Sequence, residues 1–298
     1  MKIKSVALVY KKSSYELYAK VRKDHHFLNL IERAHPIIGR FVPSHDAHEA
    51  SVNEVRSILK KMNIRVKNVY RAKSFSEKGL DLVITVGGDG TFLDASHSVS
   101  SVPILGVNSN PDDSVGMFCG VTSQTLESYL HLMIEDRVSP TKMTRLKIQT
   151  DSRQIQTPVL NDILITNSTP AATSRIEIVS GQVREEIKCS GIWISPAAGS
   201  TAGIRSAGGK ILPIESKRFQ FLVREPYLLP GHKSKLISKI LKPQETLTVY
   251  SKMRTGGIYL DGSHRSHRFP LGEKAMISTK APILVVYGFN KRRRALFK

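Results

Sequence analysis

The sequence predicts a doubly wound α/β domain followed by a β-sandwich-like domain. Three observations lead to this fold class. The first 140 residues alternate strand-like and helical segments, a glycine run joins a continuous apolar strand to a helix, and the chain beyond Pro140 consists mostly of short β-branched runs separated by turn residues. A chain of 298 residues is also long enough for two cores.

The first domain, 1–140, is expected to be Rossmann-like. Continuous apolar runs such as Leu82 to Val86 are typical of parallel strands that are covered on both faces. Amphipathic spacing, with Val52, Val55, Ile58 and Leu59 on one face, indicates a helix at 47–62. The expected strands are 6–10, 66–70, 82–86 and 104–108, and the expected helices are 14–30, 47–62, one starting at Phe92, and 126–134.

The second domain, 141–272, is expected to be all-β. Its strand-like runs are 146–150, 162–166, 175–179, 192–195, 219–223 and 247–250. The remaining segment, 273–298, carries one more buried-type strand at 283–287.

Composition limits the class of protein. The excess of 45 Lys and Arg over 25 Asp and Glu gives a net charge of +20, which attracts polyanions, including nucleotide phosphates. The basic tail, Lys291 to Arg294, is predicted to be a solvated end, not a nucleic-acid contact. No apolar run approaches the roughly 18 residues that span a bilayer. The N-terminus leads into a strand without a targeting leader, so a cytoplasmic protein is expected. The two cysteines, Cys119 and Cys189, are expected in the core.

The strongest local signal for chemistry is the run Gly87, Gly88, Asp89, Gly90 and Thr91. It follows a predicted strand and precedes a helix, where glycines and free backbone N–H groups suit a phosphate. Asp89 could hold a ligand hydroxyl and take its proton, and Thr91 is predicted to cap the helix. The run lacks the ending of a Walker A loop and the spacing of the dinucleotide fingerprint, which argues against an ordinary Rossmann dehydrogenase.

Three further clusters are ambiguous by themselves. The small residues at 197–203, continuing at 206–209, suit either a flat nucleotide or a tight turn. Asn161 with Asp162, and Asp261 with Gly262, read alone as strand-end turns.

His264 and His267 have a spacing that could bind zinc, but the neighbouring arginines argue against it, and no metal site is predicted in the protein.

Taken in order, these clusters resemble the motifs of the NAD kinase family. The motifs are 87–91, Leu105 to Asn108, Asn161 with Asp162, Gly199 to Ala202 leading to 206–209, and Asp261 with Gly262. The first motif is shared with diacylglycerol and sphingosine kinases, so a lipid kinase is the alternative. A non-catalytic nucleic-acid-binding protein is a weaker alternative, because it leaves the ordered motifs unexplained.

The resemblance implies ATP-dependent phosphorylation of the 2′-hydroxyl of the adenosine ribose of NAD⁺, NADH or both, with Mg²⁺ or another divalent ion accompanying ATP. Asp89 would be the catalytic base. The resemblance also implies a C-terminal segment that returns to the first domain, homodimers or homotetramers, and no nucleic-acid or membrane partner. The residues implied to bind substrate are Gly87, Gly88, Gly90, Thr91, Asn161, Asp162, Gly199, Ser200, Thr201, Ala202, Ser206, Asp261 and His264.

Two departures from the family pattern are visible. Most members have a nucleotide-stacking tyrosine where this chain has Gly203, and the stretch 109–119 replaces a short Gly-rich segment. That stretch, the run 160–165, and the pattern of Pro170 with Ser174 and Arg175 look more like the mitochondrial and plant NADH-kinase branch. Use of NADH, as well as or in preference to NAD⁺, is therefore a hypothesis.

Overall fold

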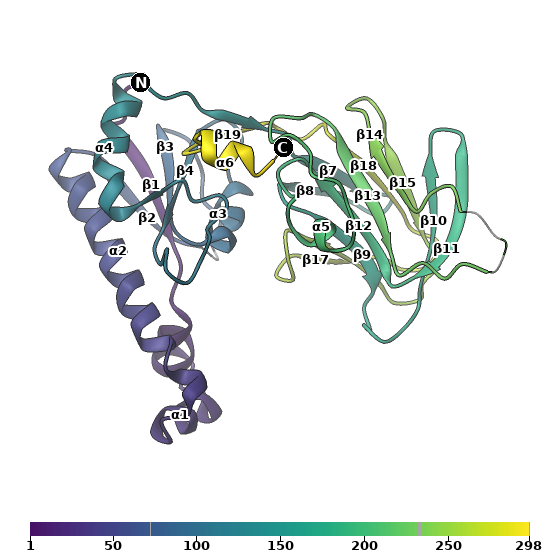
Figure 1. Cartoon of the computed structure of the whole chain (residues 1–298), viewed down its shortest axis with the longest axis horizontal. Helices are drawn as coiled ribbons and strands as arrows, with labels where there is room; N and C mark the ends of the chain where they lie inside the picture. The colour runs from purple at the N-terminus through teal and green to yellow at the C-terminus, as the bar shows by residue number, and fades with distance from the viewer. Residues whose placement is uncertain (72, 230, 232–233, 298) are drawn as a thin grey trace. The chain divides into compact units, whose positions relative to one another are not determined.

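The computed structural model of the chain describes residues 1–71, 73–229, 231 and 234–297. The chain forms two compact units, one of Met1–Thr141 with Val285–Asn290 and one of Lys142–Leu284 with Lys291–Lys298 (Figure 1). Of the predicted returning segment, 273–298, the part that belongs to the first unit is therefore Val285–Asn290.

The first unit is organised around a seven-stranded sheet in the order β2-β1-β3-β4-β19-β6, with β5 beside β4. Strands β1 to β5 and β19 pair in parallel, as β1 with β2 and β3, and β4 with β3, β5 and β19. Every residue of β3 and β4 is buried, which explains their continuous apolar sequences. The bounds are β1 Ser5–Tyr10, β2 Arg65–Tyr70, β3 Leu82–Gly87, β4 Ile104–Asn108, β5 Val121–Thr122, β6 Thr141–Met143 and β19 Leu284–Tyr287.

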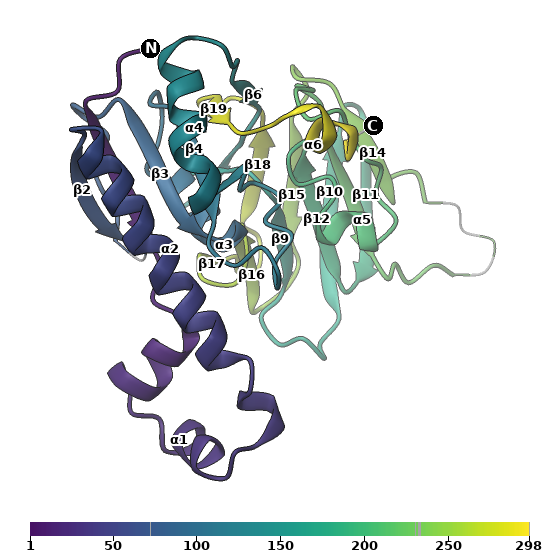
Figure 2. The same cartoon turned by 60° about the vertical axis from the view of Figure 1, so that its left-hand side comes forward.

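Helices cover both faces of this sheet, as the doubly wound prediction requires (Figure 2). Helices α2 (Phe41–Lys61) and α4 (Ser123–Ile134) contribute Val55 and Leu126 to the cluster that contains Leu8 and Ile84 of the sheet. Helix α3 (Asp89–Ser96) covers the other face, where a Cβ on Gly106 would lie 3.0 Å from the Phe92 ring. Phe92 in turn stacks on Phe118, with ring centroids 5.2 Å apart.

The helix predicted at 14–30 is wrong as a single element. The structure has a π-helix, η1 (Glu16–Val21), then α1 (His25–Glu32) and a 3₁₀ turn, η2 (Pro36–Ile38). Lys23 interrupts the segment with a positive φ of 50°, and the Asp24 side chain accepts the Phe27 N–H at 2.8 Å to cap a new helix. A local cap therefore overrides the continuous helical spacing.

The second unit contains two six-stranded antiparallel sheets, ordered β11-β10-β15-β18-β7-β8 and β14-β13-β12-β9-β16-β17. One buried cluster joins side chains of both sheets, for example Ile148 and Val249 with Ile165 and Phe221, so the unit is a β-sandwich. The predicted fold class is confirmed. The bounds are β7 Leu146–Thr150, β8 Gln154–Val159, β9 Ile163–Asn167, β10 Ser174–Ser180, β11 Val183–Cys189, β12 Gly191–Pro196, β13 Phe219–Arg224, β14 Ser238–Leu241, β15 Leu247–Ser251, β16 Gly256–Leu260, β17 Ser266–Arg268 and β18 Lys274–Ser278, with short helices α5 Gly203–Ser206 and α6 Lys291–Ala295.

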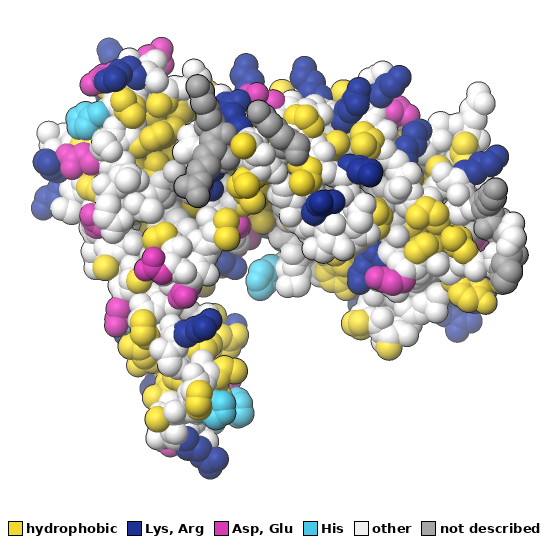
Figure 3. Space-filling view, viewed as in Figure 1, with side chains coloured by type: hydrophobic (Ala, Val, Ile, Leu, Met, Phe, Trp, Pro, Cys, Tyr) yellow, Lys and Arg dark blue, Asp and Glu magenta, His cyan; other side chains and the backbone are white. Residues whose placement is uncertain are grey.

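The surface carries the basic excess as scattered side chains. On the face drawn in Figure 3, Lys and Arg are interspersed with polar and apolar groups. The basic tail, predicted as a solvated end, forms α6, and its Arg294 pairs with Glu215 at 2.9 Å. Both cysteines are buried, and neither forms a disulfide within the part of the chain that the structure describes. No helix within the described ranges is long and apolar enough to cross a membrane.

Candidate active site

The order of the parallel strands identifies where the first unit can bind a ligand. After β1 the chain adds β2 on one side, and it then adds β3 and β4 on the other. In open parallel sheets, ligands bind outside the carboxyl ends of the strands at such a switch point. Here the switch lies between β1 and β3, whose carboxyl ends lead into Lys11 and the Gly87–Thr91 motif.

The glycine motif turns sharply from β3 into α3. A Cβ on Gly87 would lie 2.5 Å from the Oγ1 of Thr91, so glycine is required by close approach. The helix begins at Asp89 with Gly88 as its N-cap, so the prediction that Thr91 caps a helix starting at Phe92 is wrong. Thr91 is instead buried, and within the described ranges its Oγ1 has no hydrogen-bond partner.

The Asp89 carboxylate is held by the backbone of the following loop. Its Oδ2 accepts the Met117 N–H at 2.9 Å and its Oδ1 accepts the Phe118 N–H at 2.8 Å. Asn108, at the end of β4, braces the same loop by donating from Nδ2 to the Ser114 carbonyl at 2.7 Å. A carboxylate has about four acceptor positions, so each Asp89 oxygen can still accept a hydrogen bond from a ligand. The side chain is half-buried.

Two cations, which sequence reasoning did not single out, flank this motif. A Cβ on Gly90 would lie 3.4 Å from an Arg71 nitrogen, and Arg71 pairs with Asp94 at 3.0 Å. Burial, and secondly repulsion from Arg71, lower the pKa of Lys11 below its ordinary value. In the described part of the chain, Lys11 forms no salt bridge. Lys11 also lines a pocket of about 190 Å³ with Ser13, Ser14, Arg40, Phe41, Ser44 and Asp113.

In the second unit, a pair of acidic side chains organises the turn before β9. Asp261 accepts three backbone N–H groups, from Leu160 at 3.0 Å, Asn161 at 2.7 Å and Asp162 at 3.1 Å. The Asn161 amide donates to Asp162 Oδ2 at 2.8 Å. Burial, and secondly the negative charge of Asp261, raise the pKa of Asp162 to about 7. The structure therefore joins two motifs that lie about a hundred residues apart.

The small-residue cluster packs against this turn. A Cβ on Gly199 would lie 1.7 Å from the Asn161 carbonyl oxygen, so no other residue fits there. Ser200 is fully buried, and its hydroxyl donates to the Ala197 carbonyl at 2.7 Å and accepts the Leu212 N–H at 3.0 Å. Thr201 and Ala202 are half-buried, while Ser206 and His264 are exposed. Ser200 thus has a packing role, and Thr201 and Ala202 are more accessible to a ligand.

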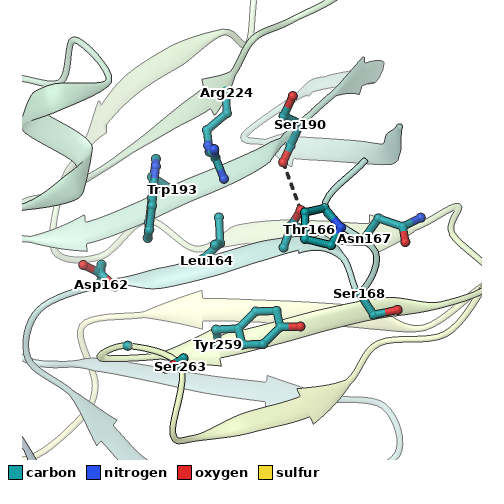
Figure 4. Close-up of a pocket in the computed structure, with 12 residues that line it drawn as sticks. Asp162, Leu164, Thr166, Asn167, Ser168, Ser190, Trp193, Arg224, Tyr259 and Ser263 are labelled. Carbon is teal, nitrogen blue, oxygen red and sulfur yellow. Dashed lines mark hydrogen bonds between the residues drawn. The ribbon is translucent and has the colours of Figure 1, made fainter. Parts of the chain in front are cut away.

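A pocket of about 410 Å³ opens on the outer face of the sheet that contains β9 (Figure 4). Sequence reasoning identified one of its lining residues as a site residue, Asp162. The others that matter chemically are Trp193 on β12, Tyr259 on β16 and Arg224 at the end of β13. Isolated aromatic and arginine residues on strands carry no motif, so only their assembly in the fold reveals them. The remaining lining residues are Leu164, Thr166, Asn167, Ser168, Pro170, Ser190, Gly262 and Ser263.

A carboxylate that follows a glycine turn at a switch point, with cations beside it, is the arrangement expected of a phosphotransferase, here on an α/β domain joined to a β-sandwich. The model of the ATP-NAD kinase N-terminal domain matches residues 29–137. A probable NADH kinase of Oryza sativa is 34% identical over 80% of this chain and 81% of its own length. An NADH kinase of Arabidopsis thaliana is 36% identical over 80% and 83%. The chain belongs to the NAD kinase family.

Solved structures agree on the fold. An NAD kinase from Archaeoglobus fulgidus in complex with ATP superimposes with a TM-score of 0.70 and 20% identity, covering 98% of this chain and 96% of that one. Yeast NADH kinase complexed with NADH gives a TM-score of 0.71 and 15% identity, covering 98% and 86%. The alternative of a lipid kinase receives no support from these relatives.

Proposed function

We propose that this chain transfers the γ-phosphate of ATP to the 2′-hydroxyl of the adenosine ribose of NAD(H). The observation that carries the proposal is the position of Asp89: a carboxylate inside a glycine turn, at the switch point of a parallel sheet, in a chain of the NAD kinase family. Asp89 would act as the base that orients the attacking hydroxyl and takes its proton.

The proposed reaction transfers one proton, forms one bond and breaks one bond. The Asp89 carboxylate accepts the proton of the 2′-hydroxyl, the ribose oxygen forms a bond to the γ-phosphorus, and the bond between this phosphorus and the β-phosphate oxygen breaks, releasing ADP. Phosphoryl transfer needs mainly alignment and neutralisation of charge. The two backbone N–H groups that hold Asp89 fix the direction of its oxygens, and this supports the alignment.

For the donor, we propose that Lys11 and Arg71 neutralise the triphosphate beside Gly88, Gly90 and Thr91. Lys11 is half-buried and forms no salt bridge with the described residues, so its charge is electrostatically unfavourable until an anion binds. Mg²⁺, or another divalent ion, would reach the site bound to the phosphates of ATP. Among the described residues, no group of three or more His, Cys, Asp or Glu side chains could hold a metal ion. Carboxylate and phosphate oxygens are the ligands that Mg²⁺ prefers, so the Asp89 site suits a metal carried by ATP.

For the acceptor, we propose that Asn161 and Asp162 contact the adenosine, and that Thr201, Ala202 and Ser206 contact the adenine. Gly199 and Ser200 would act by packing, since both are buried against neighbouring backbone. Asp261 would position the Asn161 turn, because its carboxylate is already bound by three backbone N–H groups. His264 is exposed on the loop that follows Asp261, and we propose that it contacts the phosphates.

We also propose that the chain uses NADH, that it works as a homodimer or homotetramer, and that it is cytoplasmic. The two plant relatives named NADH kinase support the first of these. Biosynthesis of NADP(H) would be the cellular role.

The test is an assay of the purified chain with Mg-ATP and either NAD⁺ or NADH. Formation of NADP⁺ or NADPH, with one ADP released for each, is expected. A parallel reaction would replace the dinucleotide with diacylglycerol in liposomes and should give no product. Phosphorylation of the lipid, or hydrolysis of ATP without NADP(H), would overturn the proposal.

A further inference from the structure

The buried face of helix α2 changes from apolar to polar along the helix. Its later part consists of Val52, Val55, Ile58 and Leu59, which pack in the cluster beneath the sheet. Its earlier part consists of His45, His48 and Ser51, one helical turn apart. Apolar side chains would serve packing there as well, because a buried polar group costs free energy unless it is hydrogen-bonded. The polar residues therefore indicate that this end of α2 has hydrogen bonds to make.

His48 connects the ends of two strands of the sheet. It is only 1% exposed, and its Nε2 lies 2.8 Å from the carbonyl oxygen of Lys11, the residue after β1. A carbonyl oxygen can only accept, so Nε2 carries the ring proton and donates it to Lys11. The other nitrogen, Nδ1, lies 2.9 Å from the hydroxyl of Ser109, the residue after β4, and accepts its proton. One buried ring thus joins the carboxyl ends of β1 and β4.

Ser109 extends this connection to the glycine motif. Its N–H donates to the Gly87 carbonyl at 3.2 Å, at the carboxyl end of β3. Its own carbonyl accepts the Ser51 hydroxyl at 3.1 Å. Ser109 is therefore held from α2 by both His48 and Ser51, and it in turn holds the first glycine of the turn that leads to Asp89.

The surroundings of His48 keep its ring neutral. Burial lowers the pKa of His48 below its ordinary value. The hydrogen bond to the Lys11 carbonyl and the charge of Glu49 oppose this shift, whereas the charges of Lys11 and His45 add to it. A neutral imidazole has one donor and one acceptor nitrogen, which matches a carbonyl on one side and a hydroxyl on the other.

This inference rests on the proposed function, which assigns Lys11 to the triphosphate and Asp89 to the attacking hydroxyl. We infer that His48 is a positioning residue for both groups, acting on Lys11 through its backbone carbonyl and on Asp89 through Ser109 and the glycine turn. His48 lies beneath the sheet ends, out of reach of a substrate. The Nε2 contact aligns the cation for ATP, and the Nδ1 contact aligns the catalytic carboxylate, so each ring nitrogen affects a different kinetic constant.

Two substitutions separate these contacts. The amide nitrogen of Gln lies as many bonds from Cβ as Nε2 of histidine, and the amide oxygen of Asn lies as many bonds from Cβ as Nδ1. His48→Gln keeps the donor to Lys11 and loses the acceptor for Ser109, so kcat should fall by about two- to tenfold, the effect of one neutral hydrogen bond, at unchanged KM for ATP. His48→Asn keeps the acceptor and loses the donor, so KM for ATP should rise by about two- to tenfold at unchanged kcat.

His45 provides a matched control on the same helix. It is also buried, and its Nδ1 lies 2.9 Å from the hydroxyl of Ser13. Ser13 accepts the Glu16 N–H at 3.0 Å, so this pair fixes the start of η1 instead of the strand ends. His45→Asn should lower the melting temperature about as much as His48→Asn and leave kcat and KM for ATP unchanged.

Ser109→Ala is a milder variant that removes a single hydroxyl. It should reproduce the lower kcat of His48→Gln with KM for ATP unchanged, and it serves as the test where a histidine variant does not fold. Equal kinetic changes in His48→Gln and His48→Asn, a loss of thermal stability with neither kinetic change, or a wild-type kcat in Ser109→Ala would overturn the positioning role while the kinase activity stands. Failure of the wild type to form NADP(H) would instead overturn the proposed function.

Discussion

The carboxylate of Asp261 accepts the backbone N–H of Asn161 at 2.7 Å, across a hundred residues of sequence. The same carboxylate binds the N–H groups of Leu160 and Asp162. One acidic side chain therefore fixes the turn on which the proposed adenosine contacts are built.

Asp261→Ala should destabilise the protein and weaken acceptor binding. It leaves three backbone N–H groups without their acceptor, at a cost of about 1–3 kcal/mol for each group that stays buried and unpaired. Urea denaturation and KM for NAD(H) measure the two effects. Asp151→Asn is the control, because Asp151 is an exposed partner of Lys274 at 3.1 Å and such pairs contribute little. Equal stability of the two variants would contradict this role of Asp261.

Asp89→Asn should lower kcat by about 10²–10⁴-fold, the usual contribution of a positioned base. Asp81→Asn is a matched control, since Asp81 also accepts two backbone N–H groups, from Lys4 at 2.7 Å and Ser5 at 2.9 Å, but precedes β3 instead of following it. Both variants lose similar backbone hydrogen bonds, so thermal melting should change alike. A nearly active Asp89→Asn enzyme would remove the base assignment.

Lys11→Met should raise KM for ATP by about 10- to 100-fold, because a hydrogen bond to a charged group contributes about 1.5–3 kcal/mol. KM for the dinucleotide should change little. Lys12→Met is the neighbouring control, since Lys12 is engaged with Glu16 at 3.6 Å and with the Tyr70 ring. If both lysine variants have the same KM for ATP, Lys11 does not bind the triphosphate.

Asp162 should make stability depend on pH. Its pKa rises from an ordinary value of 3.8 to about 7 in the folded protein, so the folded state holds a proton that the unfolded state releases. The stabilising contribution is complete below pH 3.8 and is lost as the pH rises to about 7. The side chain that Asp162→Asn introduces does not ionise, so the variant keeps this stability as the pH rises. At pH 8 its free energy of unfolding should exceed that of wild type by about 1–4 kcal/mol.

Urea denaturation at pH 5 and pH 8 measures this difference, and kcat/KM for NAD(H) should fall in the same variant. A gap between variant and wild type that is the same at both pH values would mean that Asp162 does not titrate in this range.

Most of the strands that the sequence predicted have neighbours on both sides, and β2 is the predicted strand that lies at the edge of its sheet. Strands β3 and β4 are buried throughout, so their sequences are uniformly apolar. The strands β8, β11, β14 and β17 were not predicted, and each lies at the edge of its sheet, where one flank is exposed and the apolar pattern is weak. The inner strands β16 and β18 were also missed.

The candidate site also contains features that the sequence predicted and features that it did not. The glycine motif with Asp89 is local, because a short run of sequence makes both the turn and the carboxylate, and it could be predicted. The hold of Asp261 on Asn161, the approach of Arg71 to Gly90, and the meeting of Trp193 with Arg224 depend on strands that lie side by side only after folding. No single stretch of sequence contains these relationships.

The place of β19 has a consequence for synthesis. This strand pairs with β4, through Val286 with Ile104 and Tyr287 with Leu105, yet it is translated after every strand of the sandwich. Until β19 has been made, Ile104 and Leu105 of β4 lack their partners along one flank of the α/β sheet, where β5 pairs only with Val107 and Asn108. This edge of β4 is the last edge of the sheet to be paired. A chain terminated before residue 284 should therefore leave β4 open to aggregation.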